Sequence, residues 1–126
     1  MISSIYAALA ALIIVWLALR VIKVRRAKRV RLGDGGKPEL LAAIRAHGNA
    51  TEYLPISLIL LVLLELSGGP IALVHFGGIA IISGRLLHAK GLITDNLRYR
   101  VLGMQVTIFT LIGLAIADLA YPFFRQ

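Results

Sequence analysis

The chain contains no cysteine, which excludes a disulfide framework, a thiolate metal site and a cysteine nucleophile. Any reactive thiol must therefore be supplied by a ligand. Acidic residues are also scarce, since 6 Asp and Glu stand against 14 Lys and Arg in 126 residues. A net charge of +8 suits a nucleic-acid partner, but the basic residues flank apolar segments and follow no nucleic-acid-binding motif. We therefore expect no nucleic-acid partner.

Charged residues make up only 16% of the chain and hydrophobic residues 59%, so a soluble fold of this size would leave too much apolar surface exposed. The sequence predicts an all-α integral membrane protein, with one four-helix bundle domain over residues 1–126 that contacts the lipid bilayer. The transmembrane helices are expected at about residues 2–22, 38–66, 71–88 and 97–121. The first segment lacks the basic start and cleavage site of a secretory signal, so we expect it to remain as a helix.

The basic residues lie almost entirely on one side of the predicted membrane. Nine Lys and Arg residues fall within 20–45 and four within 85–100, whereas the other side has only Arg125. The positive-inside rule therefore places the connections 23–37 and 89–98 in the cytoplasm and both termini on the opposite side.

One polar stripe is expected on the second helix. Arg45, Asn49 and Glu52 are spaced i, i+4, i+7 and share one helical face. The apolar run after them, residues 53–64, is too short to cross a bilayer alone, so this stripe lies near or inside the hydrocarbon boundary. Two interpretations remain open: either Arg45 and Glu52 neutralise each other while Asn49 bonds a neighbouring helix, or the stripe binds a small zwitterion.

Further polar residues are expected at the same depth. Arg85 and His88, spaced i, i+3, end the third helix, while Arg98 and Arg100 begin the fourth and cannot share a face if that turn is helical. Arg100 shares its side of the helix with Met104 and Thr107, so we favour Arg100 for the bundle interior and Arg98 for lipid headgroups. The histidines are spread over different faces and depths, so no metal site is expected. Glu65 and Asp118 lie near the other ends of their helices, where solvation is the default expectation.

These motifs resemble one known family. Residues 45–55 (RAHGNATEYLP) resemble the second-helix signature of the MAPEG family, the membrane-associated proteins of eicosanoid and glutathione metabolism. Residues 84–88 (GRLLH) resemble the end of its third helix, and Arg100 stands where its fourth helix supplies an arginine. The closest likeness is to the small bacterial inner-membrane branch, which shares residues 33–36 (GDGG) and the pair Gly103 and Met104. The resemblance therefore implies a multi-pass protein of a bacterial inner membrane, with periplasmic termini.

The resemblance also implies a homotrimer that binds glutathione, as co-substrate, between neighbouring subunits near the cytoplasmic face. By position, Asn49 and Glu52 would hold the amino end and backbone of the peptide. His88 and either Lys23 or Arg25 would hold its carboxylates. The remaining roles fall on arginines: Arg100, or else Arg98, would contact the sulfur, and Arg45 and Arg85 would brace the site.

The function implied is that of a glutathione transferase or peroxidase acting on lipophilic electrophiles from the bilayer. Three residues depart from other members: Gly48 replaces an arginine, and Met104 and Leu92 stand at or near tyrosine positions. The alternative is therefore a non-catalytic binding or structural membrane protein. A small multidrug transporter is disfavoured, because such carriers need a carboxylate in the first helix and residues 2–22 contain none.

Overall fold

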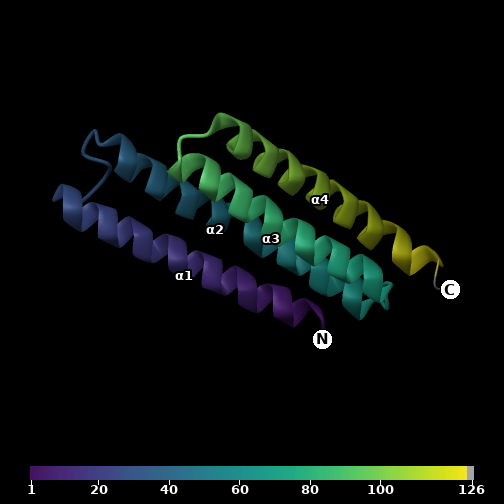
Figure 1. Cartoon of the computed structure of the whole chain (residues 1–126). Coiled ribbons are helices and arrows are strands. Elements are labelled where there is room, and N and C mark those ends of the chain that lie inside the picture. Colours follow the sequence, from purple (N-terminus) through teal and green to yellow (C-terminus); the bar gives the residue numbers. More distant parts are fainter. Residues whose placement is uncertain (125–126) are drawn as a thin grey trace.

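The protein is represented by a computed structural model that describes residues 1–124, with side-chain surroundings for residues 1–122, so Arg125 lies outside the described residues. The predicted all-α, four-helix fold is confirmed over this range (Figure 1). All four helices are long and apolar enough to span a membrane. They are α1 (Ser3–Lys28), α2 (Pro38–Leu66), α3 (Ile71–Ile93) and α4 (Leu97–Phe124).

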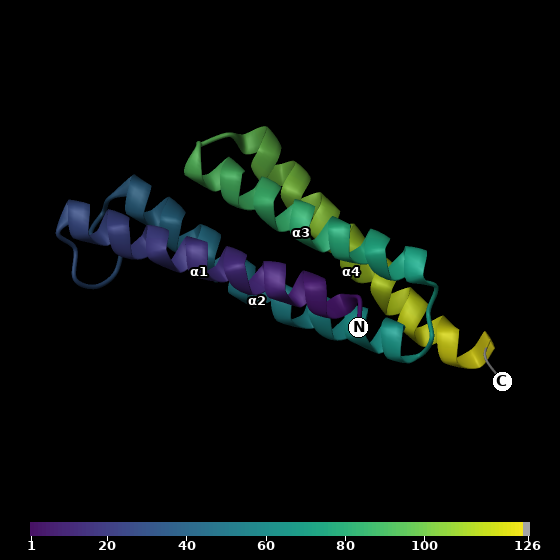
Figure 2. The same cartoon turned by 60° about the horizontal axis from the view of Figure 1, so that its bottom comes forward.

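The helices run lengthwise beside one another, with α2 and α3 at the centre of the arrangement. Each of these two contacts the other three helices, whereas α1 and α4 lie on opposite sides of them. The α1–α2 and α3–α4 connections lie at one end of the bundle, and the start of α1 and the end of α4 lie at the other (Figures 1 and 2). The polar residues near both connections are therefore brought to one end of the molecule.

Two of the expected connections are shorter than predicted, because helix continues into them. α1 extends past the expected end at Ile22 to Lys28, so the connection is 29–37 rather than 23–37. Residues 23–28 are mostly good helix formers, and their positive charges favour the negative C-terminal end of the helix dipole. α3 extends past His88 to Ile93, which leaves only residues 94–96 between α3 and α4.

Gly91 explains why the end of α3 was misjudged. The sequence suggested a loop around this glycine, but it lies within α3 and faces the start of α4, where an added Cβ would overlap the backbone of Arg100. Its function is close helix packing rather than helix termination. α4 likewise continues to Phe124 instead of ending at Tyr121, because Pro122 in a last turn removes only one helical hydrogen bond.

The expectation of a solvated Glu65 is wrong. Its carboxylate, on α2, accepts hydrogen bonds from the backbone N–H groups of Ile2 and Ser3 at 2.8 and 2.7 Å. These donors belong to the start of α1, where N–H groups have no partner within the helix. Glu65 therefore caps α1 from a different helix. Asp118 also departs from expectation, because both of its carboxylate oxygens are shielded and have no hydrogen-bond partner within the described residues.

Candidate functional site

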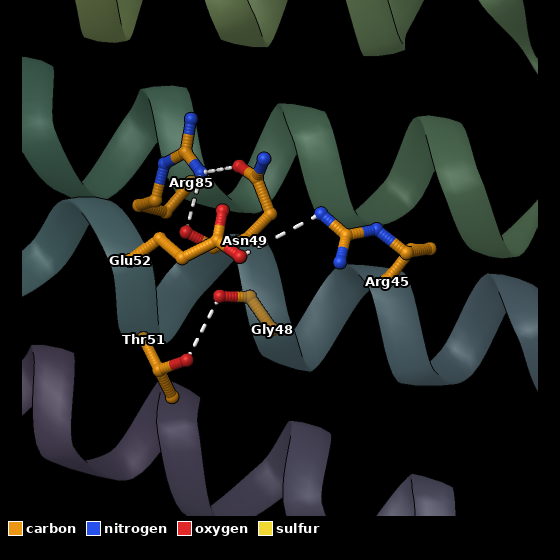
Figure 3. A network of polar contacts seen from close by, with 6 residues as sticks. All are labelled: Arg45, Gly48, Asn49, Thr51, Glu52 and Arg85. Carbon is orange, nitrogen blue, oxygen red and sulfur yellow. Dashed lines mark hydrogen bonds and ion pairs between the residues drawn. The ribbon is translucent and has the colours of Figure 1, made fainter. Parts of the chain in front are cut away.

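Arg85 is the centre of a polar network that joins α2, α3 and α4. It is only 2% exposed, although it lies in a membrane-spanning helix. From α2, the backbone and side-chain oxygens of Asn49 accept hydrogen bonds from its Nη1 (Figure 3). From α4, Thr107 Oγ1 accepts from Nε at 3.1 Å and Nη2 at 2.5 Å. A buried guanidinium needs such partners, and here they fix both neighbouring helices.

Two further contacts complete the surroundings of this guanidinium. It lies over the ring of Tyr53, with Cζ 5.1 Å from the ring centroid, and Nη2 is 3.8 Å from Met104 Sδ. A cation over an aromatic ring is stabilised electrostatically, more strongly where water is absent. With its donors engaged by protein groups, Arg85 positions other residues rather than contacting a ligand.

A close approach of α3 and α4 brings Thr107 to Arg85. At Gly84, an added Cβ would lie 2.9 Å from Thr107 Oγ1 and 3.2 Å from the carbonyl oxygen of Gly103. Thr107 also donates to that carbonyl at 2.9 Å, which orients its hydroxyl oxygen toward Arg85. Small residues on both helices therefore determine the geometry of the polar network.

The stripe on α2 divides into a buried part and an accessible part. Asn49 points to α3, and its side-chain N–H₂ has no hydrogen-bond partner within the described residues. Arg45 and Glu52 form an ion pair, with Nη2 and Oε1 3.7 Å apart and both side chains at least half exposed (Figure 3). A pair this exposed contributes little to stability, so both groups can pair with a ligand instead. The structure thus contains both contacts of the first interpretation, the ion pair and the hydrogen bond of Asn49 to a neighbouring helix, and it also contains the accessible groups that the second requires.

A polar cavity of about 270 Å³ opens between α2 and the α3–α4 turn. Arg45 and Arg100 both line it, whereas Arg98 lines a shallow recess on another face of α4. The structure therefore places Arg100, and not Arg98, beside the stripe on α2. The other lining residues are Pro38, Leu41, Ala42, Gly91, Leu92, Asp95 and Leu97.

The predicted site residues His88, Lys23 and Arg25 do not line this cavity. His88 is 6% exposed, and Arg45, Arg85 and Arg100 lie within electrostatic range of its imidazole. Lys23 is exposed on α1, outside the residues that line the cavity. Arg25 Nη1 donates to the carbonyl oxygens of Gly33 at 2.8 Å and Val30 at 3.4 Å, so it closes the α1–α2 connection. Within one chain, neither Lys23 nor Arg25 therefore lines the cavity between α2 and the α3–α4 turn.

Tyr53 is a member of the network that the sequence did not identify, although it lies four residues after Asn49 and helical spacing could have placed it on the same face. The expectation that Thr107 faces the bundle interior is confirmed, since it is 4% exposed. Its partner was not predicted, because that depends on how α4 packs on α3. Among the described residues no group of three or more His, Asp or Glu side chains could hold a metal ion.

Comparison with known proteins supports the resemblance found in the sequence. Residues 3–120 match the sequence profile of the MAPEG family. The chain is 40% identical over 121 residues to inner membrane protein YecN of Escherichia coli strain K12, a match covering 96% of this chain and 92% of that protein. The protein of the same name from Escherichia coli O6:H1 gives the same identity and coverage.

Proposed function

This chain belongs to the MAPEG family of membrane proteins, and we propose that it binds glutathione and joins it, through its sulfur, to lipophilic electrophiles or uses it to reduce lipophilic peroxides. The observation that carries this proposal is that Arg45 and Arg100 line one cavity. Glu52 forms an ion pair with Arg45, and Asn49 lies on the same stripe of α2, although neither residue lines the cavity itself. Glutathione has two carboxylates, one ammonium group and one thiol near neutral pH. Guanidinium groups suit the carboxylates, Glu52 suits the ammonium, and the unpaired amide N–H₂ of Asn49 suits a peptide carbonyl.

The size and exposure of the cavity favour a site shared between copies of the chain. Its volume of about 270 Å³ is slightly below the range of roughly 300–1,000 Å³ that is usual for ligand pockets. Arg45, Glu52 and Arg100 are exposed although they lie in membrane-spanning helices, where uncovered charges are unfavourable. A neighbouring copy covers them and supplies further contacts in the proposed homotrimer. Lys23, on the exposed side of α1, is suited to reach a ligand held by an adjacent copy.

The proposed chemistry rests on the positive charge of Arg100. A guanidinium beside the sulfur of glutathione stabilises the thiolate, which is the nucleophilic form of the thiol. The proton of the thiol leaves to solvent. The thiolate then bonds to an electrophilic carbon, either by addition or by displacing a leaving group that departs with its electron pair. With a peroxide, the thiolate attacks one oxygen and the O–O bond breaks to release an alcohol; a second glutathione then reacts with the oxidised sulfur to give glutathione disulfide and water. Asn49, held by Arg85, fixes the peptide relative to Arg100, while His88 adds a polar group behind the arginines.

The second candidate function is a binding or structural membrane protein without catalysis. It is supported by Gly48, which adds no side chain to the polar stripe, and by the contact of Met104 with Arg85 at a position where a tyrosine hydroxyl is absent. In that case the network around Arg85 serves helix packing and ligand binding alone.

The test is an ultraviolet difference spectrum of the purified, detergent-solubilised protein titrated with glutathione. We expect a saturable thiolate absorbance that is lost in Arg100→Ala and retained in Arg98→Ala, because Arg100 lines the cavity and Arg98 does not. Calorimetric binding without any thiolate signal would favour the non-catalytic candidate. Binding that survives both Glu52→Ala and Arg100→Ala unchanged would contradict the proposed site.

A further inference from the structure

A second basic recess lies at the end of α1, apart from the cavity between α2 and α4. It has a volume of about 320 Å³ and is lined by the side chains Arg25, Arg26, Arg29, Val30 and Arg31. Four guanidinium groups around one recess repel one another unless an anion lies between them. Arg25 is occupied with the carbonyl oxygens of the connection, but the other three arginines form no ion pair within the described residues.

The backbone at the end of α1, beside this recess, adopts a sterically disfavoured conformation. α1 ends with Arg29 in the left-handed conformation (φ 55°), while the N–H groups of Arg29 and Val30 bond the carbonyl oxygens of Arg26 and Arg25. Glycine usually occupies the left-handed residue of such a helix end, because a side chain there is sterically disfavoured. This chain carries an arginine instead. The conformation turns residues 30 and 31 back beside the last turn of α1, so that arginines on both sides of the bend line one recess.

The recess lies at the depth of lipid headgroups. The apolar run of α1 ends at Ile22, and Arg26 follows one turn later, roughly 6 Å further along the helix axis. The headgroup layer is about 5–8 Å thick on each side of the hydrocarbon core, so Arg26 is level with lipid phosphates. Leu32, which follows Arg31 in the chain, is 90% exposed, and at this depth its apolar side chain would be covered by lipid.

We propose that this recess binds the phosphodiester group of an anionic phospholipid, with Leu32 in contact with its acyl chains. Arg26, Arg29 and Arg31 supply the donors, since guanidinium groups match phosphate oxygens in charge and geometry. A soluble phosphate has no acyl chain and gains nothing from Leu32. The lipid therefore anchors the α1–α2 connection to the membrane surface, independently of the glutathione site.

The test measures binding of single lipid molecules to the full chain in uncharged detergent micelles by native mass spectrometry. The probes are dioleoylphosphatidylglycerol, dioleoylphosphatidylcholine and water-soluble glycerol phosphate. Arg31→Gln should weaken phosphatidylglycerol binding by about tenfold, the effect of losing one charge-assisted hydrogen bond. Lys37→Gln removes the same charge from the same connection but does not line the recess, so it should weaken binding by less than about twofold.

Arg29→Gly separates loss of the ligand contact from loss of folding. Glycine accepts the left-handed conformation, so this variant should keep or raise the melting temperature while it loses lipid affinity. Equal losses in Arg31→Gln and Lys37→Gln would overturn the proposal, because they would indicate diffuse attraction only. Equal binding of phosphatidylcholine would also overturn it, as would binding of glycerol phosphate as tight as that of phosphatidylglycerol, which would indicate a site for free phosphate.

Discussion

The side chains of Arg85 and Asn49 are joined by a hydrogen bond from α3 to α2, within two helices that are long and apolar enough to span a membrane. The same guanidinium holds Thr107 on α4, so three helices meet at one charge. The packing of α4 therefore affects the position of Asn49 in the proposed glutathione site. The effect is indirect, because it passes from Thr107 through Arg85 to Asn49.

Replacing Thr107 by valine should destabilise the protein. The substitution keeps the shape of the side chain but removes the acceptor of two hydrogen bonds from a buried guanidinium, and an unsatisfied buried donor costs about 1–3 kcal/mol. Thermal denaturation in detergent measures the effect. The matched control is Thr110→Val, because Thr110 donates only to a carbonyl oxygen of its own helix, at 2.6 Å. Equal melting temperatures for the two variants would contradict this role of Thr107.

Two glycine substitutions should have effects of opposite sign. Gly84→Ala places a methyl group 2.9 Å from Thr107 Oγ1 and 3.2 Å from a backbone oxygen, and such overpacking costs about 1–3 kcal/mol. Gly113→Ala meets no atom within 4 Å and should stabilise α4 by up to about 1 kcal/mol, through helix propensity alone. Melting temperatures of the two variants test the pair. A tolerated Gly84→Ala would mean that α3 and α4 separate easily.

Removing the carboxylate of Glu65 should loosen the start of α1. Glu65→Ala deprives the N–H groups of Ile2 and Ser3 of their acceptor, and the loss of a helix cap costs about 0.5–2 kcal/mol. Hydrogen exchange of the first turn of α1 measures it locally. Glu65→Gln, which keeps one acceptor oxygen, should fall between Ala and wild type. The control is Glu39→Ala, because its ion pair with Lys28 is exposed and contributes little. Unchanged exchange in Glu65→Ala would show that water caps the helix equally well.

The membrane orientation can be tested by labelling single introduced cysteines, because the chain has no cysteine of its own that would also react. We expect Leu32→Cys and Thr94→Cys to be protected from a membrane-impermeant maleimide in intact cells, because the positive-inside rule places their connections in the cytoplasm. Ser67→Cys, between α2 and α3, should be labelled. The opposite labelling pattern would reverse the topology, whereas the arrangement of the helices would be unaffected.

The sequence predicted those features that depend on local pattern. Helical spacing placed Arg45, Asn49 and Glu52 on one face, and charge counting grouped the basic ends of the helices. Other features depend on the register between helices, which a single sequence does not reveal. A glycine shortly before polar residues predicts the end of a helix. Gly91 nevertheless lies inside α3, and its packing partner, the backbone of Arg100, is close only in the folded chain. Thr107 as acceptor and Glu65 as cap were missed for the same reason.

The order of the network partners along the chain has a consequence for biosynthesis. α2, with Asn49 and Tyr53, leaves the ribosome before α3 brings Arg85 to the membrane, whereas Thr107 follows last. An arginine at the centre of an inserting helix costs roughly 2.5–3.5 kcal/mol, and Arg85, which lies beyond the middle of α3, costs less than this. Because Asn49 and Tyr53 precede it, α3 can insert as a hairpin with α2, in which its one buried charge already has partners. When α4 inserts afterwards, it adds Thr107, which accepts the remaining hydrogen bonds of the Arg85 guanidinium.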